Sequence, residues 1–165
     1  MTDHSYEVSV RWTGDRGTGT SGYRDYGRDH VISATGKHDV LGSADPTFRG
    51  DRDRWNPEEM VLAALSQCHM LSYLYVATTL GITVVDYQDR ATASLDAHPD
   101  GTGELTSVLL RPVVTIQESD RVDAARAAHA EANRLCFIAR SVSFPVHHEA
   151  EIRVLGADAS VGAAG

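Results

Sequence analysis

Apolar residues follow two different periods along this chain, and each period predicts a different secondary structure. Residues 6–12 alternate between apolar and polar side chains, which is typical of a strand with one buried face. Residues 30–34 and 39–41 are further short apolar runs, and Gly36-Lys37 between them favours a tight turn. The first quarter of the chain is therefore predicted to hold three strands.

Helical periodicity begins after a polar loop, and its start carries strong end signals. Asn56 is a favourable N-cap, Pro57 suits the first helical position, and Glu59 completes an arrangement like a capping box. Gly81 is a typical residue just past a helix end. The pattern predicts a helix over about residues 57–80, roughly 35 Å long at the usual rise per residue.

This predicted helix is apolar on most of its sides rather than along one stripe. A helix that is hydrophobic all round has to be buried all round, and one sheet of a small domain covers only one side. A second copy of the chain is the simplest cover for the other side. The apolar positions that lead to this expectation are Met60, Val61, Leu62, Ala63, Ala64, Leu65, Met70, Leu71, Leu74, Val76 and Ala77.

Strand-like runs return after Gly81. Residues 83–97 and 104–117 read as two long strands, and the Gly- and Asp-rich residues 99–103 predict a hairpin turn between them. Asp120 is expected to cap an amphipathic helix over about residues 121–135.

The end of the chain completes the pattern with a short piece and a strand. Residues 136–142 look short and helical or irregular, and residues 146–154 alternate as a final strand. The order β-β-β-α-β-β-α-β predicts an α+β domain. We expect one domain over residues 1–155 and a disordered tail, rich in Gly and Ala, over 156–165.

Composition narrows the function classes. The 165 residues are 42% hydrophobic and carry a formal charge of −8, which argues against nucleic acid as a partner. The Asp51-Arg52-Asp53-Arg54 run is interpreted as a solvated surface. No run of about 18 apolar residues occurs, and the N-terminus does not resemble a signal peptide, so neither a membrane span nor membrane association is expected. These features predict a cytoplasmic protein.

Only two cysteines occur, Cys68 in the long predicted helix and Cys136 after the second. A structural disulfide is not expected in a reducing compartment, and the spacing is not that of a Cys-x-x-Cys pair. No zinc-ligand spacing is present. His147-His148-Glu149 could offer metal ligands, but neighbouring residues on a strand point to opposite faces, so we predict no metal site there.

Two interpretations of the cysteines follow. Both could be inert core residues, because burial keeps a thiol protonated, or they could form a protected redox centre. His69 neighbours Cys68 in sequence, but adjacent helical residues do not face each other, so His69 is expected to be a packed or interface residue. Glu58 lies ten residues before Cys68, about 15 Å along one helix, and could approach Cys68 only across two antiparallel helices of a dimer.

A carboxylate alone would raise the pKa of the thiol, so a cation has to lie between Glu58 and Cys68. Arginine suits this role because it stays charged and binds a carboxylate through two parallel hydrogen bonds. The candidates are Arg24, Arg28 and Arg49 in the loops before the helix. Each of them could equally be a solvated loop charge.

The residues then resemble a known family. Asn56-Pro57-Glu58-Glu59, the small and apolar run to Cys68, the Gly42 to Pro46 loop and Cys136-Phe137-Ile138-Ala139 are together similar to the OsmC/Ohr family of osmotically inducible and organic hydroperoxide resistance proteins. The resemblance covers nearly the whole domain and is closer to the OsmC branch. It implies antiparallel sheets packed around a long central helix in an intertwined homodimer.

The resemblance also implies roles. Cys68 matches the peroxidatic cysteine, Cys136 the resolving cysteine, and Glu58 the glutamate that holds the catalytic arginine. In the OsmC branch that arginine lies shortly before the Asn-Pro-Glu start, which favours Arg49; the Ohr branch would favour Arg24 or Arg28. A sulfenic acid on Cys68 would condense with Cys136 to a disulfide, which a dithiol donor, often a lipoylated protein in this family, would reduce.

The expected function is therefore a thiol-dependent peroxidase that reduces organic hydroperoxides to alcohols without a cofactor. Apolar residues near the cysteines in sequence, Phe48, Trp55, Met70, Phe137, Ile138 and Phe144, would suit an alkyl or aryl peroxide, although each is also an ordinary core residue. The alternative is a dimer of the same fold that acts as a non-catalytic binding or structural protein, because fold does not imply function.

Overall fold

The computed structural model describes residues 3–156, which form two α-helices, three short 3-10 helices and nine strands. This α+β content agrees with the sequence prediction. The chain divides into two compact units, residues 1–60 and 61–165, and each is described by itself. Of the predicted tail, residues 157–165 lie outside the described residues, and the prediction of a single domain over 1–155 stays a prediction.

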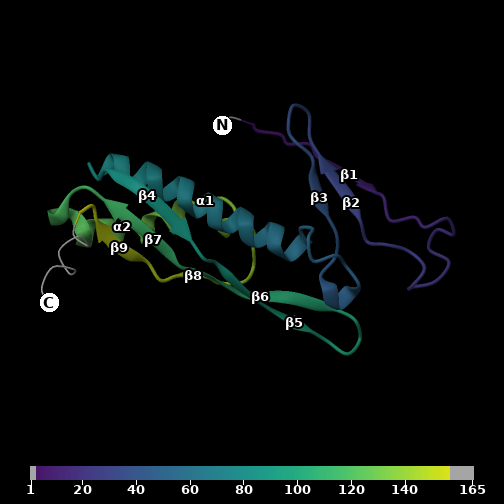
Figure 1. The fold of residues 1–165 in the computed structure, drawn as a ribbon. Helices are drawn as coiled ribbons and strands as arrows, with labels where there is room; N and C mark the ends of the chain where they lie inside the picture. The colour runs from purple at the N-terminus through teal and green to yellow at the C-terminus, as the bar shows by residue number, and fades with distance from the viewer. Residues whose placement is uncertain (1–2, 157–165) are drawn as a thin grey trace, which may run out of the picture. The chain divides into compact units, whose positions relative to one another are not determined.

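The first unit holds an antiparallel sheet in the order β1-β2-β3, visible in Figure 1. Its strands are β1 (Ser9–Trp12), β2 (His30–Ser33) and β3 (Val40–Gly42). The hairpin between β2 and β3 confirms the predicted turn, and Gly36 takes a positive φ of 74° there. The first strand is shorter than predicted, because its pairing with β2 begins only at Ser9.

The loop before the long helix is tied to the same sheet. After the 3-10 helix η1 (Pro46–Phe48), the chain returns to β3, where Trp55 forms an isolated parallel bridge with Gly42. Trp55 donates its N–H to the carbonyl of Leu41 at 3.1 Å and accepts from the N–H of Ser43 at 2.9 Å. This anchoring fixes the residue that precedes the helix cap.

Helix α1 (Pro57–Thr79) begins with the predicted capping box. Asn56 Oδ1 accepts the backbone N–H of Glu59 at 2.8 Å, and Glu59 Oε2 accepts the N–H of Asn56 at 3.2 Å. These reciprocal bonds satisfy two backbone donors that a helix start otherwise leaves open. At the other end Gly81 takes a φ of 64°, the left-handed conformation expected just past a helix.

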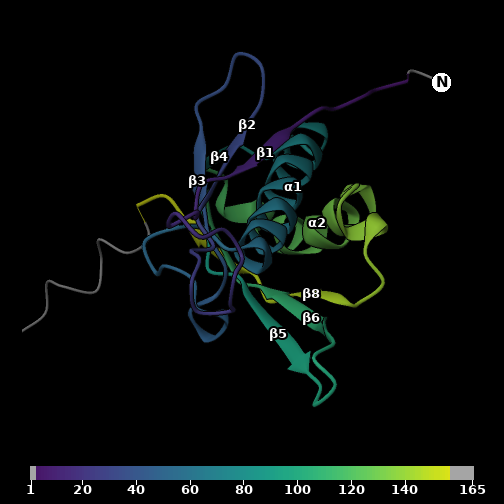
Figure 2. The same cartoon turned by 90° about the vertical axis from the view of Figure 1, so that its right-hand side faces the viewer.

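The second unit contains two three-stranded sheets rather than one pair of long strands. One has the order β4-β7-β9, and the other, seen with its long β5–β6 hairpin in Figure 2, has the order β5-β6-β8. The strands are β4 (Val84–Asp89), β5 (Thr92–Ala97), β6 (Gly103–Leu110), β7 (Pro112–Ile116), β8 (Val146–His148) and β9 (Glu151–Val154).

Each long strand predicted from the sequence is therefore interrupted, and the interruptions lie beside one another in neighbouring strands. They lie between β4 and β5, between β6 and β7 at Arg111, and between β8 and β9. Pro112 explains the middle break, because proline has no N–H to donate to a ladder. Both sheets are mixed: β8 runs parallel to β6, and β9 runs parallel to β7.

Helix α2 (Val122–Leu135) follows the 3-10 helix η2 (Ser119–Arg121). The prediction that Asp120 caps this helix is wrong, because Asp120 lies within the 3-10 helix and Arg121 occupies the N-cap without a side-chain bond. The connection is fixed instead by Glu118, whose Oε2 accepts the N–H of Thr83 at 2.9 Å. A third 3-10 helix, η3 (Ala139–Ser141), follows α2 and agrees with the short helical piece predicted there.

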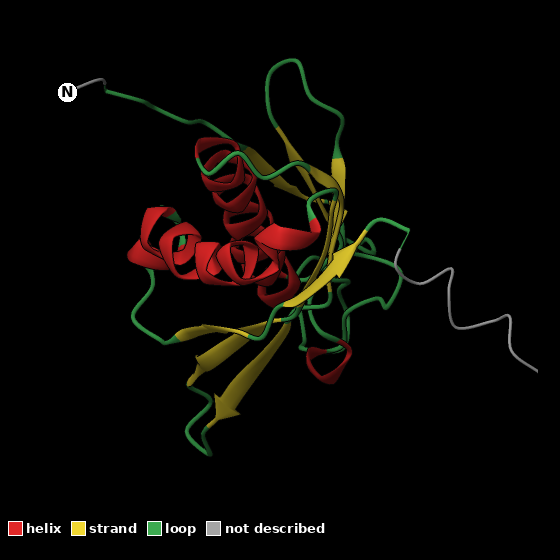
Figure 3. Cartoon of the chain, turned by 90° about the vertical axis from the view of Figure 1, so that its left-hand side faces the viewer, coloured by secondary structure: helices red, strands yellow, loops and turns green. Residues whose placement is uncertain are grey.

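Two apolar clusters hold the second unit together. The larger one joins α1, α2 and the β4-β7-β9 sheet, with both helices on one face of that sheet (Figure 3). Its members are Tyr73, Val76, Ala77, Ile82, Val114, Ile116, Ala125, Ala128 and Ala132. The smaller one packs Leu65 of α1 against Val108 and Leu110 of β6.

One face of α1 remains uncovered in the single chain. Leu71 and Tyr75 are 60% and 63% exposed, although both lie in the middle of an apolar helix. Among the described residues α1 is also the one helix long and apolar enough, by length and composition alone, to cross a membrane. Core helices of soluble proteins meet the same criterion, so this property says little about location.

Candidate active site

The fold brings the two cysteines together. Cys68 lies in α1 and is partly exposed, whereas Cys136 is the buried C-cap residue of α2, and both are free thiols. Burial, and after it hydrogen bonding with the neighbouring Cys68 thiol, raises the pKa of Cys136 to about 11. The sulfur of Cys136 also accepts the backbone N–H of Ala139 at 3.4 Å.

The two thiols differ in their accessibility. Cys68 is the more accessible of the two thiols, while Cys136 is 1% exposed. A small reagent in solution therefore reaches Cys68 more easily than Cys136. Disulfide formation between residues on two packed helices requires the closeness of the two thiols, because the sulfur atoms have to approach to bonding distance.

Glu58 and Arg49 belong to the first unit. Glu58 lies in the first turn of α1, and its Oε2 is buried without a hydrogen-bond partner among residues 3–156. Arg49 ends the 3-10 helix η1 in a left-handed conformation with a φ of 68°, which non-glycine residues rarely adopt. Its side chain is exposed. Their roles towards the cysteines stay predictions.

The two alternative arginines differ in how firmly they are held. Arg28 donates to the carbonyls of Tyr26 and Tyr23 at 2.7 and 2.9 Å, and its guanidinium lies 4.2 and 4.4 Å from the centres of those two rings. These contacts anchor the loop in which Arg28 lies. Arg24 is exposed on the same loop.

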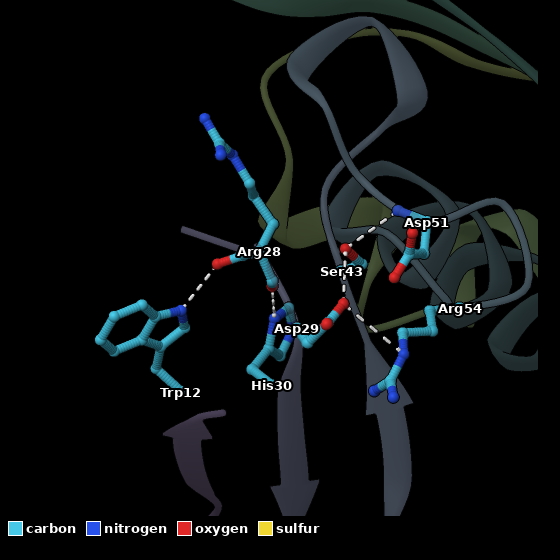
Figure 4. Close-up of polar contacts among 8 residues, drawn as sticks. Trp12, Arg28, Asp29, His30, Ser43, Asp51 and Arg54 are labelled. Atoms are coloured by element: carbon cyan, nitrogen blue, oxygen red, sulfur yellow. Dashed lines mark hydrogen bonds and ion pairs between the residues drawn. The ribbon is translucent and has the colours of Figure 1, made fainter. Parts of the chain in front are cut away.

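A polar network that the sequence did not suggest stabilises the loop before α1 (Figure 4). Asp29 pairs with Arg54 at 3.6 Å and accepts from the hydroxyl of Ser43 at 3.5 Å, and Ser43 in turn accepts the N–H of Asp51 at 3.1 Å. Hydrogen bonding with the carboxyl of Asp29 and repulsion from it raise the pKa of Asp51. Arg54 is therefore a structural residue rather than the solvated charge that we expected.

Three histidines meet in the core of the second unit, and only the packing of His69 was anticipated. His69 of α1 and His129 of α2 are 1% and 0% exposed, and His69 Nε2 lies 3.0 Å from His129 Nδ1. The ring of His148, from β8, lies 5.5 Å from that of His69 and 5.8 Å from that of His129, measured between ring centres. The sequence offers little indication that these three histidines lie together, because they are far apart in the chain.

Burial dominates the electrostatics of these histidines. Together with repulsion from His148, which Asp89 partly offsets, burial lowers the pKa of His69 to about 4. Burial, with smaller contributions from His69 and His148, lowers the pKa of His129 to about 3. Both rings are therefore neutral at physiological pH.

Within residues 3–156, no group of three or more His, Cys, Asp or Glu residues has a geometry that could hold a metal ion. His147 is exposed while its neighbour His148 joins the buried histidines, as expected for adjacent positions on a strand.

Comparison with known proteins identifies the family. Residues 50–151 match the family model described as OsmC-like protein. A search of curated proteins found no significant match.

Solved structures are similar over nearly the whole chain. An OsmC-like protein of unknown function from Vibrio cholerae is 31% identical, with a TM-score of 0.76 over 91% of this chain and 99% of that one. An OsmC-like protein from Mycoplasma pneumoniae is 15% identical, with a TM-score of 0.71 over 92% and 99% of the two chains. An organic hydroperoxide resistance protein from Legionella pneumophila is 20% identical, with a TM-score of 0.66 over 92% and 100%.

Proposed function

Because this chain belongs to the OsmC-like family, we propose that it is a cysteine-based peroxidase that reduces organic hydroperoxides to alcohols. The observation that carries the proposal is the pairing of a partly exposed thiol, Cys68, with a buried thiol, Cys136, across α1 and α2. Packing of the core alone does not require two cysteines to lie beside each other.

The proposed cycle has two steps on the protein. The thiolate of Cys68 attacks the terminal oxygen of the hydroperoxide, the O–O bond breaks, and the alcohol leaves with a proton while Cys68 becomes a sulfenic acid. Cys136 then attacks the sulfur of Cys68, so that an S–S bond forms, the S–O bond breaks and water leaves. Two electrons have passed from the two thiols to the peroxide.

Arg49 and Glu58 are the proposed partners of the reacting thiol. A guanidinium beside Cys68 would favour its thiolate, and a carboxylate would orient that guanidinium through paired hydrogen bonds. The buried and unpartnered Oε2 of Glu58 supports this role, because a buried carboxylate oxygen without a donor is costly. The Arg49 side chain is exposed and belongs to the same unit as Glu58.

The proposed enzyme is a homodimer. Leu71 and Tyr75 leave an apolar face of the central helix exposed to water. An exposed apolar face of this kind is typical of a protein–protein interface. In a dimer of antiparallel central helices, Glu58 of one chain could reach the site of the other. An isolated chain would then hold an incomplete site.

The remaining features of the proposal concern substrate, reductant and location. Phe137 and Ile138 follow Cys136 and are 78% and 37% exposed, which supports an alkyl or aryl peroxide over hydrogen peroxide. A dithiol, such as a lipoylated protein, would regenerate both thiols by exchange. The OsmC-like fold is that of a non-membrane protein, and a cytoplasmic location remains our prediction.

The decisive experiment is the intact mass of the protein before and after one equivalent of cumene hydroperoxide, followed by peptide mapping. Loss of two hydrogens with Cys68 joined to Cys136 is the expected result. Cys68→Ser should abolish peroxide consumption while the dimer stays intact. Two unchanged thiols in a folded dimer would instead point to the non-catalytic binding or structural role.

A further inference from the structure

Helix α1 is apolar on its covered face and on its open face alike. Leu65 and Val76 are buried in the core, whereas Leu71 and Tyr75 are 60% and 63% exposed. Because the hydrophobic effect is non-directional, burying one apolar face rather than another does little to fix the rotation of the helix about its axis. Directional contacts therefore have to set that rotation.

A row of polar side chains along α1 supplies such contacts. Ser66, His69 and Tyr73 follow one another at spacings of three and four residues, which places them on one face of the helix, and we call them the polar stripe. Two of them bond to α2: His69 Nε2 lies 3.0 Å from His129 Nδ1, and the hydroxyl of Tyr73 donates to the carbonyl of Ala125 at 3.1 Å. Rotation of α1 would break these bonds and leave buried polar groups unpaired, which is costly.

The third member of the polar stripe bonds to a strand instead. Ser66 Oγ donates to Oδ2 of Asp89, the last residue of β4, at 2.5 Å. Cys68 lies between Ser66 and His69 in the chain, so the two bonds to α2 hold the helix on one side of the thiol and the bond of Ser66 holds it on the other. The turn of α1 that carries Cys68 is therefore fixed from both directions.

The carboxylate of Asp89 is itself held by neighbouring strands. Its Oδ1 accepts the backbone N–H of Arg111 at 2.7 Å, and Arg111 lies at the interruption between β6 and β7. The guanidinium of Arg111 donates to Thr92 Oγ1 at 3.1 Å and lies 3.9 Å from the carboxylate of Glu149, between β8 and β9. Asp89 is therefore an acceptor fixed by several strands, and Ser66 is tied to the sheets through it.

A small rotation of α1 is enough to separate the two thiols. Side chains of a helix reach about 5–6 Å from its axis, so a rotation of about 20° moves a side-chain tip by roughly 2 Å. That displacement is about the length of an S–S bond, and a disulfide also requires a narrow range of dihedral angles. In the structure the thiols of Cys68 and Cys136 lie within hydrogen-bonding reach of each other, so this rotation of α1 suits bond formation.

We propose that Ser66 and Asp89 are positioning residues for the disulfide step, because their hydrogen bond fixes the rotation of α1 at the turn that carries Cys68 and so holds this thiol beside Cys136. The inference rests on the proposed function, which supplies the disulfide step. Ser66 and Asp89 exchange no electrons and no protons in it, and they act only through the place that they give to Cys68.

The charge of Asp89 is the other way in which this residue would influence the site, and one substitution separates the two effects. In Asp89→Asn the amide oxygen accepts the N–H of Arg111, and the amide nitrogen donates to Ser66, whose hydroxyl accepts as well as donates. Both hydrogen bonds remain and the charge is lost. A positioning role therefore predicts that Asp89→Asn behaves like the wild-type protein.

Equilibrium with glutathione measures the positioning without any peroxide. Oxidised glutathione takes two electrons from the two thiols, so one disulfide forms in the protein as two molecules of reduced glutathione are released. The ratio of dithiol to disulfide protein at pH 7.5, determined by acid quenching, alkylation and intact mass, gives the effective concentration of the two thiols. A substitution that only destabilises the fold leaves this quantity unchanged while the protein remains folded.

Ser66→Ala should lower the effective concentration about tenfold, which corresponds to a rise of about 30 mV in the reduction potential of the disulfide. Alanine is the best helix former, so the substitution does not weaken the helix itself. Thr79→Ala is the matched control, because the hydroxyl of Thr79 bonds within α1, to the carbonyl of Val76 at 2.7 Å. Thr79→Ala and Asp89→Asn should both keep the wild-type effective concentration.

Three results would overturn the positioning role. The first is a wild-type effective concentration in Ser66→Ala. The second is a tenfold loss in Asp89→Asn, which would assign the effect to charge. If urea denaturation shows that Ser66→Ala does not fold, Asp89→Ala removes the same bond from the other side, and a wild-type effective concentration in Asp89→Ala is the third.

The two proposals fail separately in this design. A tenfold loss in Ser66→Ala supports the positioning role even in a protein that is inert to cumene hydroperoxide, and that inertness ends the peroxidase proposal alone. Equal effective concentrations in Ser66→Ala and in the wild-type protein, with cumene hydroperoxide still reduced, overturn the positioning role alone.

Discussion

The imidazole rings of His69 and His129 share a hydrogen bond of 3.0 Å in the interior of the protein, although 60 residues separate them in the chain. Both rings are almost completely buried, and burial lowers the pKa of His69 to about 4 and of His129 to about 3. This pair makes the stability of the fold depend on pH in a defined window.

The sign of that dependence follows from the direction of the shifts. An unfolded histidine has a pKa of about 6.5, so between that value and the folded values the unfolded chain binds more protons than the folded protein. The free energy of unfolding should be highest above about pH 6.5 and should decrease as the pH falls towards 4. Urea denaturation at pH 7 and pH 5 should differ by on the order of 2 kcal/mol for each ring.

His129→Asn tests the assignment, because it should reduce this difference between pH 7 and pH 5. His98→Gln, on the exposed β5–β6 loop, should leave it unchanged. An equal pH dependence in His129→Asn and in the wild-type protein would mean that other groups control acid stability.

Cys136→Ser should separate the two steps of the proposed cycle. Without a resolving thiol, Cys68 should consume one equivalent of peroxide and then, with excess peroxide, add oxygen to become sulfinic acid, because no neighbour traps the sulfenic acid. Intact-protein mass with peptide mapping follows these additions. A Cys68 that stays reduced in this variant would contradict the resolving role of Cys136.

Arg49→Gly should slow the oxidation of Cys68 without harming the fold. Arg49 has a φ of 68°, which glycine adopts without strain, so the free energy of unfolding should stay equal or rise by about 0.5–1 kcal/mol. Loss of the guanidinium should slow the first step about 10²-fold or more, measured by stopped-flow with cumene hydroperoxide.

Three variants complete the comparison for the arginine. Arg49→Lys keeps a positive charge but loses the paired hydrogen bonds, so it should recover only part of the rate. Arg24→Ala and Arg28→Ala should leave the first step near the wild-type rate. A large loss in either of these, with Arg49→Gly active, would move the role to the earlier loop.

Replacing the exposed residues of α1 should dissociate the proposed dimer. Leu71→Lys with Tyr75→Lys places two charges on the uncovered apolar face, and charges are rarely accommodated in the core of an interface. Sedimentation should show a monomer. Leu95→Lys on β5, which is 42% exposed, is the control and should leave the assembly as in the wild-type protein.

The start of α1 offers a test of local stability. Asn56→Ala removes the side-chain acceptor of the Glu59 N–H and should cost about 1 kcal/mol of unfolding free energy. Asn56→Asp keeps an acceptor and should recover most of it. An unchanged stability in Asn56→Ala would show that the anchoring of Trp55 on the sheet suffices to start the helix.

Local signals in the sequence determined much of this protein. The bounds of α1 follow from Asn56, Pro57 and Gly81, because caps and positive-φ turns act over a few residues and leave a readable pattern. The turn at Asp100 and Gly101 was predicted for the same reason. The family resemblance around Cys68 and Cys136 predicted the fold class, which the comparisons confirm, and the roles of the two thiols stay predictions.

Only the tertiary structure decided features that depend on residues distant in the chain. The long strands divide into two sheets because Pro112 interrupts the ladder between β6 and β7, and because β8 pairs with β6 whereas β9 pairs with β7. The periodicity of a single strand does not reveal this division. The parallel pairing of those last strands was likewise invisible in a local pattern.

The contact among the core histidines is a second feature that depends on residues distant in the chain. His69, His129 and His148 come from three different elements, and nothing near any one of them marks it as buried beside the others. Sequence patterns report which face a side chain occupies, whereas the packing of α1 on α2 determines which side chains meet. The same packing places Cys136 against Cys68.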